Sequence, residues 1–195
     1  MPTIIKHFAL LLLSATLSFA SIGKIAALNG DISITRDSKN IKAVAGSTLE
    51  QKDVIKASKG SAAQIVFNDK TVITVGSATT FKIEEYLFDE KTPNAKFKVE
   101  EGSFKAITGK IGKIAPEKFK LETKTATIGI RGTAFVGKID KDGLLRIACT
   151  KGAITVTPNL PNVPTPPTVV PAGQMTNANN HEVEPPKPFT PGDLK

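Results

Sequence analysis

Residues 125–135 read TATIGIRGTAF, an apolar, strand-compatible stretch that contains a single charged residue, Arg131. Arginine is scarce in this chain, which otherwise has it only at positions 36 and 146. A buried guanidinium without partners is very costly, so its five donors need a carboxylate or several strand-end carbonyls. We therefore predict that Arg131 is a structural clamp between two coils or sheets, with Gly132 allowing close backbone approach and Thr133 bonding locally. The alternative is that Arg131 binds an anionic ligand, such as a carboxylate of a partner.

Alternation of apolar and polar residues continues on both sides of this stretch and predicts many short strands. Gly-Ser pairs begin at positions 46, 60, 76 and 102 and a Gly-Ala pair at 152; we expect them to mark corners, because glycine allows positive φ. Their spacing is too uneven for a strict repeat. The predicted fold is all-β, either an irregular β-solenoid or a two-sheet sandwich. The residues expected to face its core include Ile32, Ile34, Ala63, Ile65, Phe67, Phe97, Val99, Phe119, Leu121, Ile154 and Val156.

The ends of the chain differ from its centre in composition. Residues 1–20 have a basic Lys6, a short apolar run and small residues before position 21, so we predict a signal peptide cut between Ala20 and Ser21. An uncleaved anchor is the alternative; no later segment is apolar for long enough to span a bilayer. Residues 158–195 hold ten of the 13 prolines and should form a largely disordered tail, although 168–175 could add a last strand to the domain at 21–157. The predicted location is the periplasm or the exterior of the cell.

The chain has a formal net charge of +8. In an exported protein this charge favours acidic protein surfaces or anionic envelope polymers over nucleic acid. Lysines alternate with inward-facing residues on two predicted strands, and they would form one face if those strands pair. We interpret this face mainly as protection against aggregation, with binding of a polyanion as the alternative. Its lysines are Lys96, Lys98, Lys118, Lys120 and Lys124.

Residues suited to catalysis or to metal binding are few. The two histidines, His7 and His181, fall in the predicted signal peptide and tail, so neither can join a nucleophilic triad within the predicted domain. The single cysteine, Cys149, alternates with Leu145 and Ile147 and should be a small buried residue. A transition-metal site without imidazole is not expected. We predict a protein that is not an enzyme and has no cofactor or metal.

Taken together, these segments resemble the FecR domain of bacterial envelope proteins from Ile22 to about Met175. The resemblance rests on GKIAALNGDISITRD at its start, TATIGIRGTAFVGKI with its Arg-Gly-Thr, and KGAITVT and PAGQM at its end. One departure is Asn68-Asp69-Lys70, where the family often has Asp-Gly; Lys70 would be strained in a turn that needs positive φ.

The resemblance implies a β-rich extracytoplasmic module without catalytic activity. In founding members the module transmits signals from an outer-membrane iron receptor, and these regulators also carry a membrane helix and a cytoplasmic segment that binds a sigma factor. Neither is expected in this chain, so direct control of a sigma factor is not implied. The expected function is binding of an envelope or outer-membrane protein in signalling or scaffolding. The alternative is binding of peptidoglycan or lipopolysaccharide through the lysine-rich face, and the oligomeric state is left open.

Overall fold

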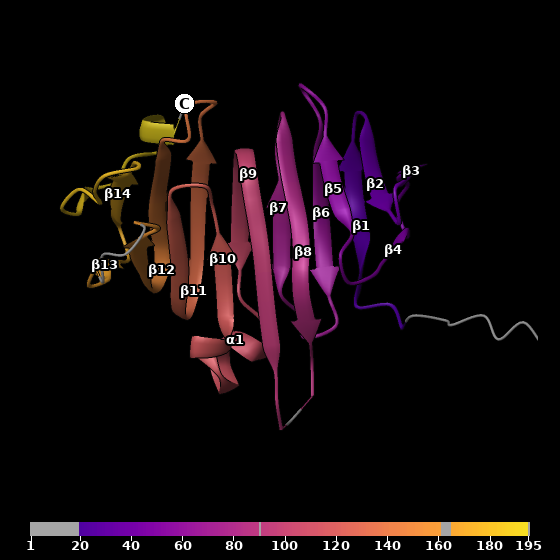
Figure 1. Cartoon of the computed structure of the whole chain (residues 1–195), viewed down its shortest axis with the longest axis horizontal. Helices are drawn as coiled ribbons and strands as arrows, with labels where there is room; N and C mark the ends of the chain where they lie inside the picture. The colour runs from indigo at the N-terminus through magenta and orange to yellow at the C-terminus, as the bar shows by residue number, and fades with distance from the viewer. Residues whose placement is uncertain (1–19, 90, 161–164, 195) are drawn as a thin grey trace, which may run out of the picture.

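The computed structural model describes residues 20–89, 91–160 and 165–194, whose strands form one continuous, open sheet (Figure 1). All strand pairs are antiparallel except that of β9 (Asn94–Ile107) with β10 (Phe119–Glu122), which is parallel. The all-β prediction is confirmed, whereas an irregular β-solenoid stays a prediction. Residues 1–19 of the predicted signal peptide lie outside the described residues; Ala20 and Ser21, on either side of the predicted cleavage site, are both exposed.

The sheet folds into two facing layers. The short strands that pair, directly or through one another, with one end of the long strands form layer A, and those that pair in this way with the other end form layer B. Layer A contains β4 (Thr48–Leu49), β1 (Gly23–Asn29), β6 (Ala62–Phe67), β7 (Val72–Val75), β14 (Gln174–Ala178) and β15 (Lys187–Pro188). Layer B contains β3 (Lys39–Lys42), β2 (Ile32–Arg36), β5 (Val54–Ala57), β8 (Thr79–Leu87), β10 (Phe119–Glu122) and β13 (Thr168–Pro171).

Three long strands belong to both layers and join them. They are β9 (Asn94–Ile107), β11 (Ala126–Ile139) and β12 (Leu145–Pro158), which run along much of the height of the molecule in Figure 1. One half of β9 pairs with β8 and β10 in layer B, while the other half pairs with β7 and β11 in layer A. Each long strand changes layer at a glycine with positive φ: Gly102 (94°), Gly132 (61°) and Gly152 (77°). Glycine adopts this conformation without the steric penalty that a Cβ brings.

Aromatic rings fill the space between the layers. The Phe97 ring from layer B lies 4.9 Å, centroid to centroid, from Phe67 in layer A, and Phe67 also stacks on Tyr86 at 5.1 Å. The residues that alternation assigned to the core are buried, from Ile32 and Ile34 through to Ile154 and Val156. Cys149 is fully buried beside Leu145 and Ile147, as predicted, and burial raises the pKa of its thiol.

Short helices lie outside the sheet. They are α1 (Ile111–Ile114), the 3₁₀ helix η1 (Pro116–Lys118) and a second 3₁₀ helix, η2 (Pro191–Leu194). In the described part of the chain, none of the helices is both long and apolar enough to cross a lipid bilayer.

The prediction of a largely disordered tail over 158–195 is wrong for residues 165–194. Strand β13 pairs with the second half of β12 and β14 with its first half, so the added strand expected at 168–175 is really two. Met175, Thr176 and Ala178 are buried, and Val183 packs on the core. The prediction counted apolar side chains, but pairing with β12 holds this segment through backbone hydrogen bonds, which depend little on side-chain type.

Candidate functional site

The Arg131 side chain is exposed, so the prediction of a buried clamp at this position is wrong. Along β11, Ile128 and Ile130 face the core, and alternation turns Thr127, Gly129 and Arg131 to the outside of layer B. The guanidinium makes no hydrogen bond or ion pair with the described residues. Its five donors are therefore free to meet another molecule.

Gly132 and Thr133 form the corner at which β11 leaves layer B. The pairing register with β12 shifts between Arg131 and Ala134, which is a β-bulge. The Thr133 N–H donates to Thr108 Oγ1 at 3.0 Å, and the Thr108 N–H donates to the Thr133 carbonyl at 3.0 Å. A Cβ on Gly152, in the neighbouring strand, would lie 2.5 Å from the Gly132 carbonyl oxygen. The predicted close backbone approach is therefore present, and Gly152 is the residue whose missing side chain allows it.

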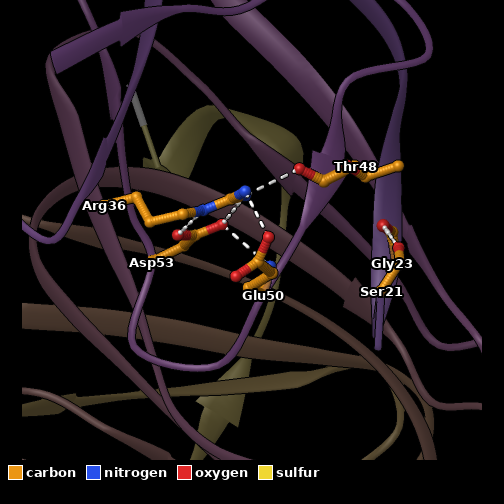
Figure 2. Close-up of polar contacts among 6 residues, drawn as sticks. All are labelled: Ser21, Gly23, Arg36, Thr48, Glu50 and Asp53. Carbon is orange, nitrogen blue, oxygen red and sulfur yellow. Dashed lines mark hydrogen bonds and ion pairs between the residues drawn. The ribbon is translucent and has the colours of Figure 1, made fainter. Parts of the chain in front are cut away.

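A paired guanidinium does join the two layers, and it belongs to Arg36 at the end of β2 (Figure 2). Its Nε and Nη2 donate to the two oxygens of Asp53 at 2.8 and 2.7 Å, its Nη1 bonds Glu50, and Nη2 also reaches the Thr48 carbonyl at 2.9 Å. The hydrogen bonding of its guanidinium to the Asp53 carboxylate is the main cause that raises the pKa of Arg36. Because β2 lies in layer B and Thr48 in β4 of layer A, the hydrogen bond from Arg36 to the Thr48 carbonyl links the two layers. Arg36 therefore has the structural role that was predicted for Arg131.

An open groove of about 660 Å³ lies next to Arg131 on the outer face of layer B. Gly129 forms its floor, since it pairs with Lys120 of β10 on one side and with Thr155 of β12 on the other. We call it the Arg131 groove. Its lining includes Lys120, Thr127, Gly129, Arg131, Thr155 and Thr157, together with Pro116 and the acidic Glu117 of η1.

The five lysines of the predicted face do not form a single row. Lys96, Lys98 and Lys120 lie on the outer side of β9 and β10, and these strands do pair, with Lys96 opposite Lys120. Lys118 lies in η1, and Lys124 lies in the turn before β11.

Acidic residues divide this face. The Lys96 Nζ lies 3.0 Å from Glu122 Oε1, and this hydrogen bond is the main cause that raises the pKa of Lys96. The Lys98 Nζ lies 4.0 Å from Glu100 Oε1. The charge of the face is therefore mixed.

A buried carboxylate that the sequence did not reveal, Asp69, holds the turn after β6 to α1. Its oxygens accept hydrogen bonds from the Tyr86 hydroxyl (3.0 Å), from the N–H (2.9 Å) and hydroxyl (2.8 Å) of Thr71, and from the Ile111 N–H (3.2 Å). The Tyr86 hydroxyl accepts in turn from the Asp69 N–H at 2.8 Å. Four donors satisfy the carboxylate without a cation, so Asp69 has a structural role. The pattern Asp-x-Thr in a turn was the available signal.

None of the described residues forms a cluster of three or more His, Cys, Asp or Glu that could hold a metal ion. The buried carboxylates of Asp53 and Asp69 are both occupied by internal donors. The outward-facing arginine beside the groove is thus the strongest candidate for a binding site.

Comparisons with known proteins agree with this description. The family model described as "FecR protein" matches residues 53–155, which extend from Asp53 through the Arg-Gly-Thr corner into β12. Two crystal structures of a proposed anti-sigma factor from Parabacteroides distasonis ATCC 8503, at 1.65 and 2.50 Å resolution, are similar in fold. Each has a TM-score of 0.53 and 18% sequence identity, and the match covers 69% of this chain and 59% of that chain. No curated protein matches the chain. Because the family model covers more than half of the sequence, this chain belongs to the FecR protein family.

Proposed function

We propose that this protein is a non-enzymatic module of the bacterial envelope that binds a protein partner through the Arg131 groove, in signalling or scaffolding. The observation that carries the proposal is the exposed guanidinium of Arg131, which no described residue engages and which lies at the β-bulge of β11. Membership of the FecR family supports a regulatory rather than a catalytic role.

The chemistry of the groove suits a carboxylate on an extended segment. Arginine presents its donors as a planar fork that matches a carboxylate, and such charge-assisted pairs are among the stronger hydrogen bonds. Lys120 on β10 adds a second positive charge beside the floor at Gly129. Thr155 and Thr157 add hydroxyl groups along the opposite wall. An acidic side chain of the partner would bind Arg131 while its backbone follows the groove.

The periplasmic or secreted location is part of this proposal and rests on the leader-like composition of residues 1–20. An envelope or outer-membrane protein is the corresponding partner class. The similar protein from Parabacteroides distasonis is described as a proposed anti-sigma factor, which is in keeping with a role in signalling.

Binding of peptidoglycan or lipopolysaccharide is the second candidate function. The observation in its favour is the adjacency of Lys96 and Lys120 on paired strands. The ion pair between Lys96 and Glu122 opposes it, because it places a negative charge within the same face. A flexible polyanion is best attracted by a continuous positive surface.

Crosslinking in the native bacterium tests whether the Arg131 groove binds a protein. A photo-crosslinking amino acid at Thr155, inside the groove, should capture a defined protein that mass spectrometry can identify. Arg131→Ala should abolish the adduct without changing the thermal midpoint, and Lys113→Ala, on the exposed surface of α1, should leave it intact. Capture that is unaffected by Arg131→Ala, or turnover of a substrate by the purified protein, would contradict the proposal.

Salt separates the two candidates. Polymer binding by the lysine face should weaken steeply between low and high ionic strength and should fall further when Lys96 and Lys98, which lie outside the Arg131 groove, are changed together to Gln. Binding that survives this double change but is lost in Arg131→Ala identifies the protein-binding mode.

A further inference from the structure

The edge strand β3 is a second surface suited to binding, at the opposite end of layer B from β13. Four strands end the two layers in the described part of the chain: β3, β4, β13 and β15. Strand β4 has two residues, β13 ends in Pro171, and β15 is the dipeptide Lys187–Pro188. Only β3 has four residues and no proline, so its backbone edge can accept another strand.

The turn between β2 and β3 determines which backbone groups face outward. Asp37 and Ser38 connect the strands, and both have positive φ (46° and 63°), the geometry of a two-residue type I′ turn. In such a hairpin the two residues that flank the turn, here Arg36 and Lys39, exchange backbone hydrogen bonds. Every second residue of β3 after Lys39 therefore bonds β2, and the residues between them direct their N–H and C=O groups away from β2. These outward residues in β3 are Asn40 and Lys42. The Ala43 N–H, one residue later, donates inward to the Ile32 carbonyl at 2.9 Å, in agreement with this alternation.

The inner side of β3 exposes apolar surface. Ile41 pairs with Ile34, whose side chain is 1% exposed in the core, yet Ile41 itself is 41% exposed. Val44, just after the strand, is 61% exposed. In an additional strand beside β3, every second side chain would lie on the inner side of the sheet, where it could cover Ile41.

The outer side of β3 is positively charged. Lys42 pairs with Ser33, which pairs on its other side with Lys56 of β5, so two lysines flank one small residue. Both lysines are exposed, and neither makes an ion pair with the described residues. A second copy of β3 would place like charges opposite one another, which disfavours pairing of two copies.

We infer that β3 binds, by strand addition, an extended protein segment in which acidic residues alternate with apolar ones. The apolar side chains cover Ile41, the acidic side chains face Lys42 and Lys56, and the backbone pairs with the outward groups of Asn40 and Lys42. This inference does not depend on the Arg131 groove, which lies several strands away in layer B.

A capped heptapeptide of alternating Glu and Val is a suitable probe, and its Lys-Val counterpart is the control. In amide NMR of the folded protein, the Glu-Val peptide should shift the Asn40 and Lys42 resonances and slow their hydrogen exchange. Equal binding of both peptides, or shifts confined to other strands, would overturn the inference. Self-association through the same two amides without peptide would also overturn it, in favour of a second copy as the occupant.

Two variants separate strand addition from simple charge attraction. Asn40→Pro removes an outward N–H that β2 does not use, and it should weaken binding of the Glu-Val peptide by about tenfold or more while the protein stays folded. Lys42→Glu keeps the edge and should weaken binding to a similar extent, so it tests the inference even if Asn40→Pro fails to fold. Lys113→Glu makes the same charge change on α1 and should leave binding unchanged. Wild-type affinity in Lys42→Glu would show that β3 is not the site.

Discussion

Arg36 and Asp53 form a two-pronged ion pair, with Arg36 Nε 2.8 Å from Asp53 Oδ1 and Nη2 2.7 Å from Asp53 Oδ2. The Asp53 side chain is fully buried, whereas that of Arg36 is 22% exposed. Asp53 also accepts the Glu50 N–H at 2.8 Å, which ties the turn after β4 to the same pair. The Asp53 carboxylate, which has no access to water, therefore ties Arg36 of layer B to the turn that follows β4 of layer A.

Replacing Arg36 should destabilise the fold because it leaves the Asp53 carboxylate buried without a cation. We expect Arg36→Ala to lower the free energy of unfolding by about 3 kcal/mol, measured by urea denaturation. Arg131→Ala is the matched control, and it should change stability by less than about 0.5 kcal/mol because the side chain is exposed. The reverse order of effects would place the clamp at Arg131 after all.

Gly152 should tolerate substitution less well than Gly132, although both have positive φ. A Cβ at Gly152 would lie 2.5 Å from the Gly132 carbonyl oxygen, so Gly152→Ala adds a backbone clash to the conformational strain. We expect it to cost about 3 kcal/mol or more. A Cβ at Gly132 meets nothing within 4 Å, so Gly132→Ala should cost only about 1 kcal/mol of strain. Thermal denaturation of both variants measures the difference; equal losses would show that the corners of β11 and β12 are not in close contact.

Tyr86 should make the fold sensitive to alkali. Its burial, together with the nearby Asp69 carboxylate, raises the pKa of the phenol well above its usual value near 10. A group whose pKa is higher in the folded state contributes stability that is complete below the unfolded pKa, so this contribution should be lost as the pH rises above about 10. Tyr86 is the only tyrosine and the chain has no tryptophan, so near-ultraviolet absorbance reports its ionisation directly.

The expected result is that tyrosinate forms only together with unfolding, monitored by far-ultraviolet circular dichroism. Lysines titrate in the same pH range, and Tyr86→Phe is the control for their effect. Above about pH 10 the stability of this variant should depend less on pH than that of the wild type. Ionisation near pH 10 in a protein with intact circular dichroism would show that the contact with Asp69 is not maintained.

Lys70→Gly should stabilise the protein. Lys70 has a φ of 70°, so this residue adopts the strained left-handed conformation that the sequence led us to expect in this turn. Its side chain is exposed, and glycine at this position removes a Cβ penalty that exceeds the entropy cost of glycine. We expect a gain of about 0.5 kcal/mol in urea denaturation, whereas Lys124→Gly, at an exposed turn residue that lacks positive φ, should lose a similar amount. A loss in Lys70→Gly would mean that the lysine side chain itself supports the turn.

The order of the sequence motifs was sufficient to predict an all-β FecR domain and to place most core residues. Alternation along β2, β6 and β12 predicted which side chains are buried, because successive side chains of a strand point to opposite faces. The same alternation, counted from Ile128 and Ile130, would have placed Arg131 outside. The prediction instead weighed the apolar composition around Arg131, and composition does not say which face of a strand a residue occupies.

The sequence by itself determined properties that depend on near neighbours: the strands, their two faces, and the glycine corners at positions 102 and 152. Only the tertiary structure decided which guanidinium links the two layers, because Arg36 and Asp53 are 17 residues apart and meet where the chain returns to the same end of the layers. It also joined Asp69 to the Ile111 N–H, 42 residues away, and brought Gly152 against Gly132. The alternation of apolar and polar residues is a local property of the sequence. Charge pairing and close packing depend on which distant strands become neighbours, and a local pattern cannot predict these contacts.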